Sequence, residues 1–336
     1  MTRACDVLVA GLGPAGASAA AAAARIGLSV IALDSKKMIG IPAQSAEFVP
    51  LPPARSARGA RAAFNGLTLR RDRLDRALAN QADAAGARLW IDSALRWVDP
   101  AARSAQVSTA NGVREIRYEV LVAADGASSA VAAALGLPRL ALASTRQLTV
   151  NLPKPLPDTE LWLSPRVPRG YAWLYPRGRV ATLGVAFPQD ADPCAADGLD
   201  ELHGALLDAR RIGDQILFRA AGSMPASGLR MRLVEDRVLF AGDAAGLAHP
   251  LTGAGAAAAV ASGARAGVAA AEWLSGEPHA LDAYEQDVRA LFGPSIERGL
   301  AARRRLLAAT PAPAVSGADP AGGWVAYPEC FARDAN

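Results

Sequence analysis

Hydrophobic positions along this chain follow two different spacings. In the first 140 residues, short apolar runs at 6–10, 29–33, 89–91, 95–98, 105–108 and 116–123 predict strands. Alanine-rich or periodic segments at 15–26, 69–85 and 128–135 predict helices between them. Within 69–85, Leu74, Leu78 and Ala82 fall on one helical face. Alternation of this kind is typical of an α/β fold with a parallel sheet.

The pattern changes to β texture from about residue 144 to 219. Alternating or aromatic runs at 147–151, 160–163, 171–175 and 180–187 are separated by Pro and Gly turns, with one helix predicted at 199–209. The α/β pattern returns at 237–243 and continues in helices at 254–274 and 280–307. We therefore expect a discontinuous domain at 1–140 and 225–305, an inserted β-sheet domain at 141–224, and a C-terminal tail at 306–336.

Composition excludes several classes of protein. With 336 residues and 51% hydrophobic content, the chain can bury a sizeable core. The net charge of +4 comes from dispersed arginines, apart from the cluster 303–305, so we expect no nucleic-acid partner. No run is long and apolar enough for an integral membrane segment. Three scattered cysteines and three scattered histidines predict no metal site and favour a reducing, cytoplasmic location.

A glycine motif follows the first predicted strand and opens the first helix. Gly11, Gly13 and Gly16 have the spacing G-x-G-x-x-G. Such glycines permit a tight turn, close approach of a pyrophosphate, and close packing of helix on strand, in that order. The second apolar run ends on Asp34, whose carboxylate would accept hydrogen bonds from a ribose. The combination predicts a dinucleotide site, which would include Pro14 and Ala15.

Four further motifs narrow this prediction. They are R-D-R-L-D at 71–75, A-D-G-A-S-S at 124–129, G-D-A-A at 242–245 followed by P-L-T-G-A-G at 250–255, and P-R-G-Y-A-W-L-Y-P at 168–176. With them, residues 6 to about 300 resemble the FAD-dependent oxidoreductases of the para-hydroxybenzoate hydroxylase superfamily, and within it the geranylgeranyl-reductase-like group. The resemblance implies a Rossmann-like FAD-binding domain of the GR2 type with an inserted, mainly β substrate domain.

The resemblance also implies FAD as the cofactor. Asp243 would bond the ribityl or pyrophosphate region, and the loop 250–255 with the following helix would lie beside the N1–C2=O edge of the flavin. A helix N-terminus there stabilises the negative charge of reduced flavin. The expected cofactor-binding residues are Gly11, Gly13, Pro14, Ala15, Gly16, Asp34, Arg71, Asp125, Gly126, Gly242, Asp243, Pro250, Gly253, Ala254 and Gly255.

The motifs indicate less about the electron donor than about the flavin-binding residues. In this superfamily the Asp125–Gly126 motif helps to connect the flavin with reduced nicotinamide, but many relatives carry an arginine where this chain has Ala132. No second glycine-rich strand–turn–helix occurs in the sequence. We therefore expect NAD(P)H to act as a transient donor that binds at the surface.

Substrate residues are expected in two places. Tyr171, Trp173 and Tyr175 alternate along one strand, so they share one face and would form an aromatic wall beside the flavin, or else ordinary sheet core. Gln44, Ser45 and Glu47 are polar candidates for catalysis near the isoalloxazine ring, or else ordinary loop residues. Ser45 falls where geranylgeranyl reductases carry a cysteine.

Three functions are compatible with these features. The leading hypothesis is a class A flavin monooxygenase that uses NAD(P)H and O₂ to oxidise an organic substrate, such as a peptide or natural-product precursor. It rests on the superfamily fold, on Ser45 in place of a thiol and on the lack of a lipid-binding extension. The alternative is an FAD-dependent reductase of isoprenoid double bonds, favoured by residues 168–176. A third is a non-catalytic FAD-binding protein. The substrate would be a small molecule, an isoprenoid or a peptide, with a protein partner in a biosynthetic pathway.

Overall fold

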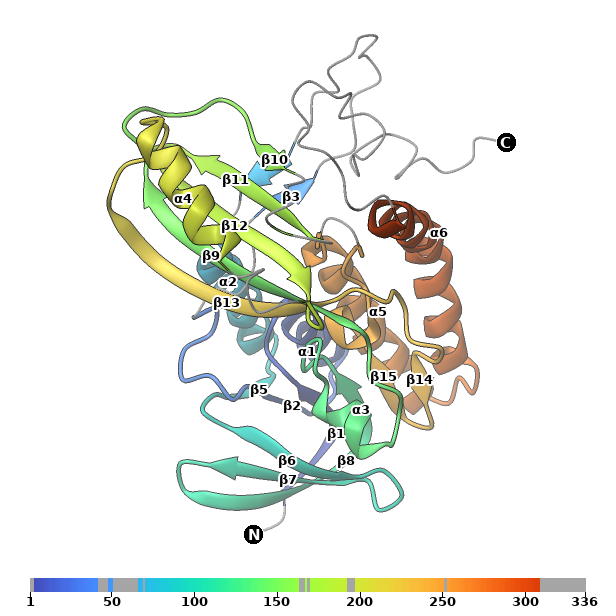
Figure 1. Cartoon of the computed structure of the whole chain (residues 1–336). Helices are drawn as coiled ribbons and strands as arrows, with labels where there is room; N and C mark the ends of the chain where they lie inside the picture. The colour runs from blue at the N-terminus through green and yellow to red at the C-terminus, as the bar shows by residue number, and fades with distance from the viewer. Residues whose placement is uncertain are drawn as a thin grey trace.

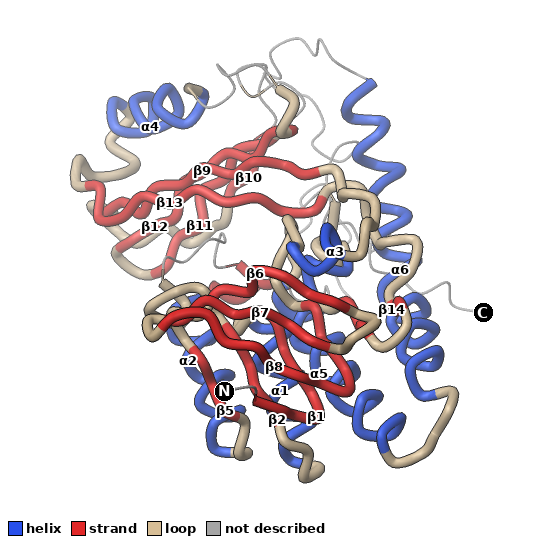
Figure 2. The backbone as a smooth tube through the Cα atoms, turned by 90° about the horizontal axis from the view of Figure 1, so that it is seen from below, coloured by secondary structure: helices blue, strands red, loops and turns tan. Residues whose placement is uncertain are grey.

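The chain folds around two β-sheets that lie in separate layers (Figures 1 and 2). The structure is a computed structural model, and it describes residues 3–41, 48–50, 66–68, 70–162, 167, 170–191, 197–250 and 253–308. Helix α4 (Gly198–Asp208) covers the outer face of one sheet, whereas α1 (Pro14–Arg25) and α5 (Ala256–Leu274) pack together against the other.

The first sheet is mostly parallel and eight-stranded, in the order β14-β15-β8-β1-β2-β5, and β7 pairs with β8 while β6 pairs with β7. Its central strands are the apolar runs of the sequence, and Val7, Leu8 and Val9 of β1 are fully buried. Parallel strands covered by helices require such runs. The strands are β1 (Arg3–Ala10), β2 (Val30–Leu33), β5 (Arg88–Trp90), β6 (Ala94–Asp99), β7 (Ser104–Thr109), β8 (Gly112–Ala123), β14 (Val234–Glu235) and β15 (Val238–Phe240).

Small residues bring α1 and α5 into very close contact. A Cβ added to Gly263 would lie 2.0 Å from the carbonyl oxygen of Ala15, and one added to Gly267 would lie 2.4 Å from that of Ala19. The alanine-rich composition of both helices is therefore a packing requirement. The remaining helices are α2 (Arg71–Ala84), α3 (Ala130–Ala134), the 3₁₀ turn η2 (Gly242–Ala245) and α6 (Ala280–Ala308).

The second sheet is antiparallel, in the order β10-β11-β12-β9-β13. Apolar side chains on its outer face, such as Leu148, Leu174 and Leu183, form one core with Leu199 and Leu206 of α4. Its inner face carries a separate cluster built around an aromatic stripe. The strands are β9 (Leu142–Asn151), β10 (Glu160–Trp162), β11 (Tyr171–Arg177), β12 (Val180–Pro188) and β13 (Ile216–Pro225).

The predicted class, a parallel α/β sheet with a separate mainly β part, is confirmed. Several details differ from the sequence analysis. Strand β9 begins at Leu142 rather than at 147, and strand β13, which matches no predicted run, continues to Pro225. Helix α5 begins only at Ala256 after a glycine-containing turn, and a short hairpin of β3 (Phe48–Pro50) and β4 (Gly66–Thr68) was not expected. The division at 140/141 and 224/225 stays a prediction. Among the described residues, no helix is both long and apolar enough to cross a membrane.

Candidate active site

The three motif glycines occupy the turn between β1 and α1, and each meets a different environment. Gly11 has a φ of +100°, and its Cβ would lie 2.3 Å from the carbonyl oxygen of Ala124. A Cβ on Gly16 would lie 1.8 Å from the carbonyl oxygen of Gly11. A Cβ on Gly13, by contrast, would meet no heavy atom within 4 Å. Gly11 and Gly16 are therefore required by the protein's own packing, whereas Gly13 leaves the turn approachable from outside.

Anion-binding features surround this turn. Helix α1 begins after Gly13 with no side-chain cap and no acidic residue in its first turn, so its free amides and dipole can face a phosphate. Asp34 lies at the end of β2, where Oδ2 accepts the amide of Leu12 at 3.0 Å and Oδ1 accepts that of Lys36 at 2.8 Å. Asp34 thus fixes the glycine turn, and the remaining lone pairs of its carboxylate can still accept a ribose hydroxyl.

Asp125 follows β8, the strand next to β1. Its Oδ2 accepts the amide of Val131 at 3.0 Å, while its Oδ1 is buried without a hydrogen-bond partner among the described residues. Burial raises the pKa of Asp125, and hydrogen bonds from Ser129 and the Val131 amide oppose that rise. Gly126 has a φ of +85° and open space at its Cβ position. Ala132, where many relatives carry arginine, is buried in α3.

Asp243 lies in η2, which begins two residues after the end of β15. The amide of Gly242 donates to the hydroxyl of Ser262 at 3.0 Å, which fixes the turn against α5. Burial raises the pKa of Asp243, and the positive charge of Arg71 opposes that rise. Arg71 itself pairs with Asp75, with Nε 3.0 Å from Oδ1. The structure therefore places two predicted residues that are far apart in the sequence, Arg71 and Asp243, within electrostatic range of each other.

The loop that precedes α5 closes as a tight turn. The amide of His249 donates to the carbonyl of Ala254 at 2.8 Å, and the amide of Gly253 donates back to the carbonyl of His249 at 2.8 Å. Gly253 has a φ of +69°, and a Cβ on Gly255 would lie 3.3 Å from Oδ1 of Asp243. The loop is thus set directly against the Gly242–Asp243 turn.

The aromatic stripe of β11 begins at this loop. A Cβ on Gly253 would lie 3.3 Å from the hydroxyl of Tyr171. Trp173 follows with its ring centroid 5.7 Å from that of Tyr171, and Tyr175 follows at 6.0 Å from Trp173. A Cβ on Gly184 of β12 would lie only 2.2 Å from Cζ2 of Trp173, so this glycine lets the indole lie across the sheet.

The stripe does not belong to the core beneath α4. Its three rings cluster instead with Met224, Ala226, Ala248 and other small side chains on the face turned toward the loop. Burial raises the pKa of both tyrosines above the usual value, so both phenols stay protonated. Nε1 of Trp173 is buried without a hydrogen-bond partner among the described residues. The wall is apolar, with a few buried polar atoms.

One supporting residue was not found from the sequence. Arg230 is buried, with Nε donating to the carbonyl of Ala244 at 2.6 Å and Nη1 to the carbonyl of Pro138 at 2.8 Å. Its guanidinium also lies 5.2 Å from the ring centroid of Phe240, and burial lowers its pKa. Arg230 thus holds η2 in place. It belongs to no motif, so only its three-dimensional contacts reveal it.

Some predicted positions cannot be placed. Gln44, Ser45 and Glu47 lie outside the described residues, as do the first two residues of the 168–176 motif. Among the described residues, no group of three or more His, Cys, Asp or Glu could hold a metal ion.

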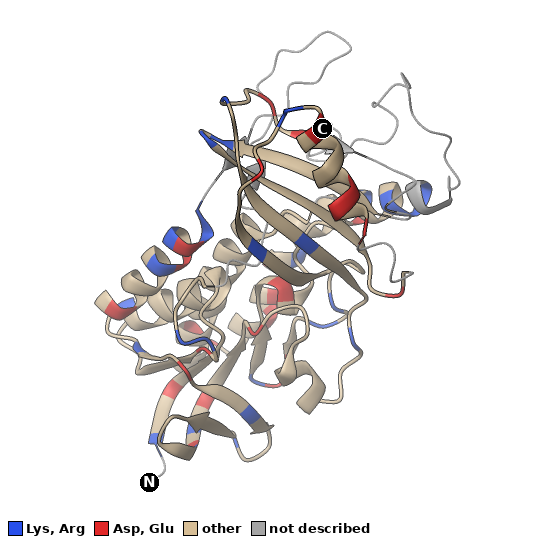
Figure 3. Ribbon diagram, turned by 60° about the vertical axis from the view of Figure 1, so that its left-hand side comes forward, with Lys and Arg blue, Asp and Glu red and all other residues tan. Residues whose placement is uncertain are grey.

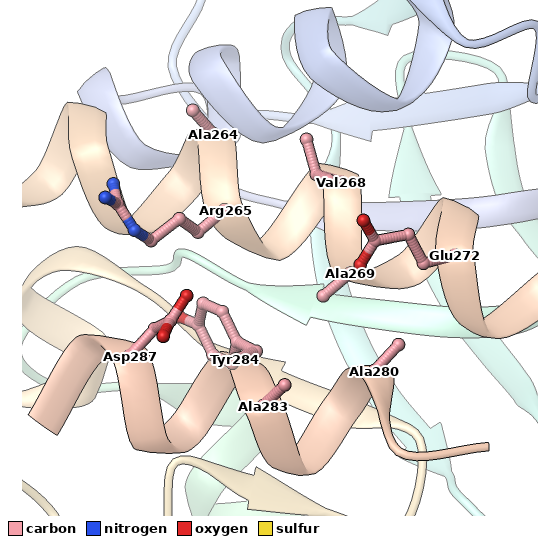
Figure 4. A pocket seen from close by; sticks show the side chains of 9 residues that line it. All are labelled: Ala264, Arg265, Val268, Ala269, Glu272, Ala280, Ala283, Tyr284 and Asp287. Atoms are coloured by element: carbon pink, nitrogen blue, oxygen red, sulfur yellow. The ribbon is translucent and has the colours of Figure 1, made fainter. Parts of the chain in front are cut away.

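A groove of about 320 Å³ lies elsewhere, between α5 and α6 (Figure 4). Arg265 and Asp287 face each other across it, and Tyr284 at its floor donates to the carbonyl of Phe240 at 2.6 Å. The groove is lined by residues 264–272 of α5 and 280–287 of α6, away from the glycine turn and the aromatic stripe. It therefore takes no part in the candidate site.

The residues gathered at the edge of the parallel sheet fit FAD. Gly13 and the uncapped start of α1 can accept a pyrophosphate, and Asp34 can accept a ribose. Oδ1 of Asp125, which has no hydrogen-bond partner within the described part of the chain, can accept a hydroxyl. Asp243 and the 253–255 turn lie beside them. The fold and the residues at this edge of the sheet are those of an FAD-binding oxidoreductase.

Comparisons with known proteins specify the family. The chain is 31% identical over 340 residues to digeranylgeranylglycerophospholipid reductase 2 from Methanothermobacter thermautotrophicus, covering 90% of this chain and 87% of the relative. The chain belongs to the family of these geranylgeranyl-reductase-like enzymes. No family model matches it.

Solved structures share the fold. A geranylgeranyl bacteriochlorophyll reductase-like protein from Thermoplasma acidophilum superposes with a TM-score of 0.82 at 23% identity, covering 96% of this chain and 90% of that one. Aklavinone-11 hydroxylase, solved with FAD and aklavinone, gives a TM-score of 0.68 at 23% identity, covering 88% of this chain and 68% of that one.

These comparisons correct the leading functional hypothesis. The monooxygenase interpretation was wrong, because several relatives at about 30% identity over most of the chain are reductases. Hydroxylases and reductases share this FAD-binding fold, so the fold motifs could not distinguish between them. The 168–176 motif was the better indicator.

Proposed function

We propose that this protein is an FAD-dependent reductase of carbon–carbon double bonds in an isoprenoid substrate. The observation that carries the proposal is the aromatic stripe of β11, which begins beside the Gly253 turn and continues along the inner face of the antiparallel sheet. A relative named as a digeranylgeranylglycerophospholipid reductase, 31% identical over most of the chain, supports the same class of substrate.

FAD would be held by residues from four segments. Gly13 and the first amides of α1 would face the pyrophosphate, Asp34 and Asp125 would accept hydroxyl hydrogens, and Asp243 would bind the region between them and the ring. When bound and reduced, FAD supplies the hydride that an isoprenoid double bond takes up together with a proton.

The protein's own contribution is to orient the apolar hydrocarbon of the substrate and to exclude water. Tyr171, Trp173 and Tyr175 are 8%, 2% and 5% exposed, so they form a dry, closely packed layer along which the hydrocarbon of a substrate would lie. Flat rings suit planar double bonds and branched methyl groups, because both can lie against the ring faces. The protonated phenols add no negative charge beside a hydride donor.

We further propose that NAD(P)H reduces the flavin by transient contact at the surface, because the sequence holds one dinucleotide motif rather than two. A cytoplasmic location accords with the three scattered cysteines, of which Cys5 is free and buried. Both statements are testable with the purified protein and with a tagged copy in cells.

A product assay tests the proposal. Purified protein reconstituted with FAD and supplied with NAD(P)H is incubated with geranylgeraniol or a digeranylgeranyl glycerophospholipid, with and without O₂. The expected product carries two added hydrogen atoms per reacted double bond and forms without O₂. A product that carries an added oxygen atom, or no product from any isoprenoid, would contradict it.

A further inference from the structure

Strand β13 is the outermost strand of the antiparallel sheet (Figure 1). It pairs with β9 on one side, and no strand among the described residues pairs with its other side. The strand is ten residues long, from Ile216 to Pro225, which is longer than most strands. An open edge of this length presents a row of unpaired backbone donors and acceptors to which an additional strand can bind.

The register with β9 shows which backbone groups of β13 face outward. The amide of Ala226 donates to the carbonyl of Ala141 at 2.8 Å, so these two residues form a hydrogen-bonded pair at the end of the ladder. Because hydrogen-bonded and non-hydrogen-bonded pairs alternate in an antiparallel ladder, the amides and carbonyls of Arg219, Ala221 and Ser223 point away from β9. No hydrogen bond to another described residue occupies these groups.

The features that normally prevent pairing at an edge lie at the two ends of β13. A β-bulge at 216–218 interrupts the register at the beginning of the strand, and Pro225 closes the other end. Between them, the segment 219–224 contains no proline and no lysine, and Arg219 is its one charged residue. The side chains of 220–223 are small, so a neighbouring backbone can approach closely. The middle of the edge is therefore open to pairing.

The outer face of this edge is positively charged. Arg219 is opposite Leu148, and Arg146 of β9 is opposite Ala221, so the two arginines are diagonal neighbours on one face. Side chains in this relation start roughly 7 Å apart. Both arginines are exposed, and neither forms an ion pair with a described residue. Figure 3 shows basic positions in blue on the strands of this sheet. The face thus carries two charges that no described carboxylate neutralises.

The inner face of the same edge is apolar. Phe218, Ala220 and Met224 alternate with the outward-facing residues, and Met224 packs with the aromatic stripe. Phe218 is 40% exposed although its side chain is large and apolar. An apolar or β-branched side chain on an added strand would cover it. An added strand would therefore meet cations on one face and an apolar surface on the other.

A second copy of this chain would fit the edge poorly. A two-fold pair of β13 strands centred on Ala221 would place Arg219 and Arg146 of both copies on the same face of one continuous sheet. Like charges that lie close together across strands are destabilising. Arg219 therefore acts against self-pairing, which is how charged residues protect edge strands. The same charge favours a partner that carries carboxylates.

We infer that the free edge of β13 binds an extended segment of a partner protein by strand addition, and that this segment alternates acidic residues with apolar ones. Its backbone would bond to the outward groups of Arg219, Ala221 and Ser223. Its acidic side chains would lie beside Arg219, and its apolar side chains would lie over Phe218 on the inner face. This inference does not depend on the proposed function, because it uses only the edge of the sheet.

Peptide binding to the whole, FAD-loaded chain tests the inference. The probe is the fluorescently labelled peptide Thr-Val-Glu-Val-Glu-Val-Thr, titrated by anisotropy beside a matched peptide with lysine in place of both glutamates. We expect the acidic peptide to bind at least about tenfold more tightly than the basic one at low salt. This preference should shrink as salt is added, because the charges are exposed.

Three variants separate pairing from general attraction. Arg219→Glu should reverse the preference, so that the lysine peptide binds more tightly. Arg96→Gln removes an exposed arginine from β6 in the other sheet and should leave both affinities within about twofold. Ala221→Pro removes an outward N–H that β9 does not use, so it should lower peptide affinity at least about tenfold with unchanged FAD occupancy and melting temperature. Arg219→Glu keeps the test decisive if Ala221→Pro fails to fold.

Amide hydrogen exchange, resolved by residue, locates the bound peptide. The amides of Arg219, Ala221 and Ser223 should exchange quickly in the free protein and become protected by the acidic peptide. Those of Ala220 and Gly222, which face β9, should exchange slowly in both states.

The opposing outcomes are equally distinct. Equal binding of the two peptides, unchanged binding by Ala221→Pro, or no new protection at the outward amides would overturn the inference. If ultracentrifugation shows a dimer that Ala221→Pro converts into monomers, the edge belongs to a second copy and the acidic partner is refuted.

Discussion

Replacing Gly16 and Gly13 by alanine, one at a time, distinguishes a glycine that the fold requires from a glycine that dinucleotide binding requires. The new methyl group at position 16 would lie 1.8 Å from the carbonyl oxygen of Gly11 and 3.2 Å from Cγ1 of Val9. Both neighbours belong to a buried strand and turn, so the helix start must move away by more than 1 Å, roughly the overlap with a normal contact. We expect Gly16→Ala to lower the free energy of unfolding by about 3 kcal/mol or more.

Gly13→Ala should behave differently. Its methyl group would meet no protein atom within 4 Å, and the φ of −71° suits any residue. Stability of the FAD-free protein should change by less than about 1 kcal/mol, the scale of a helix-cap substitution. Affinity for FAD should fall on the order of tenfold or more, about 1.4 kcal/mol, because the methyl group takes the space that a pyrophosphate needs.

Urea unfolding of the FAD-free protein and flavin fluorescence titration measure the two effects separately. Gly204→Ala in α4 is a matched control, since a Cβ there has no neighbour within 4 Å, and it should leave stability equal or higher by up to about 1 kcal/mol. Normal FAD affinity in Gly13→Ala would refute the placement of the cofactor. Wild-type stability in Gly16→Ala would refute the packing argument.

Three further predictions concern the surroundings of the site. Burial lowers the pKa of His249 from 6.5 to about 4, so between these values the unfolded chain binds a proton that the folded chain does not. The contribution of His249 to the free energy of unfolding is therefore fully present above the unfolded pKa and falls by roughly 2 kcal/mol on acidification to about pH 5. In urea unfolding experiments, the free energy of unfolding of His249→Gln should depend less on pH than that of the wild type. Gly184→Ala would place a methyl group 2.2 Å from Cζ2 of Trp173, so binding of geranylgeraniol should weaken several-fold while FAD affinity measured by fluorescence is unchanged. FAD should be released by acid into the supernatant, and flavin that stays attached to the precipitated chain would contradict noncovalent binding.

Local spacing was enough to predict much of the glycine turn and the aromatic stripe. Gly11 and Gly16 could be assigned because tight turns and close packing demand glycine at fixed intervals, and period-two alternation put Tyr171 and Trp173 on one face. The contacts of Arg230 and Arg303 could not be predicted in this way. Arg230 holds a carbonyl 14 residues away and Arg303 holds one 53 residues away, and neither belongs to a periodic pattern.

The motif predicted only part of the role of Asp34. The sequence assigned its carboxylate to a ribose, yet both oxygens also accept backbone amides that shape the turn. The type of reaction could not be predicted from the sequence for a different reason. Oxygenases and reductases need the same cofactor site, so the residues that distinguish them lie on the substrate side, where Ser45 was given more weight than the 168–176 motif.

The most direct test of the central claim is the oxidation of the reduced flavin by substrate in the absence of O₂. Protein with fully reduced FAD is mixed anaerobically with geranylgeranyl phosphate, and flavin absorbance is followed while the product is analysed by mass. The account predicts that oxidised flavin appears together with a saturated double bond, one flavin per double bond, and that Trp173→Ala slows this step while retaining FAD. Flavin that stays reduced until O₂ is admitted, followed by an oxygenated product, would contradict it.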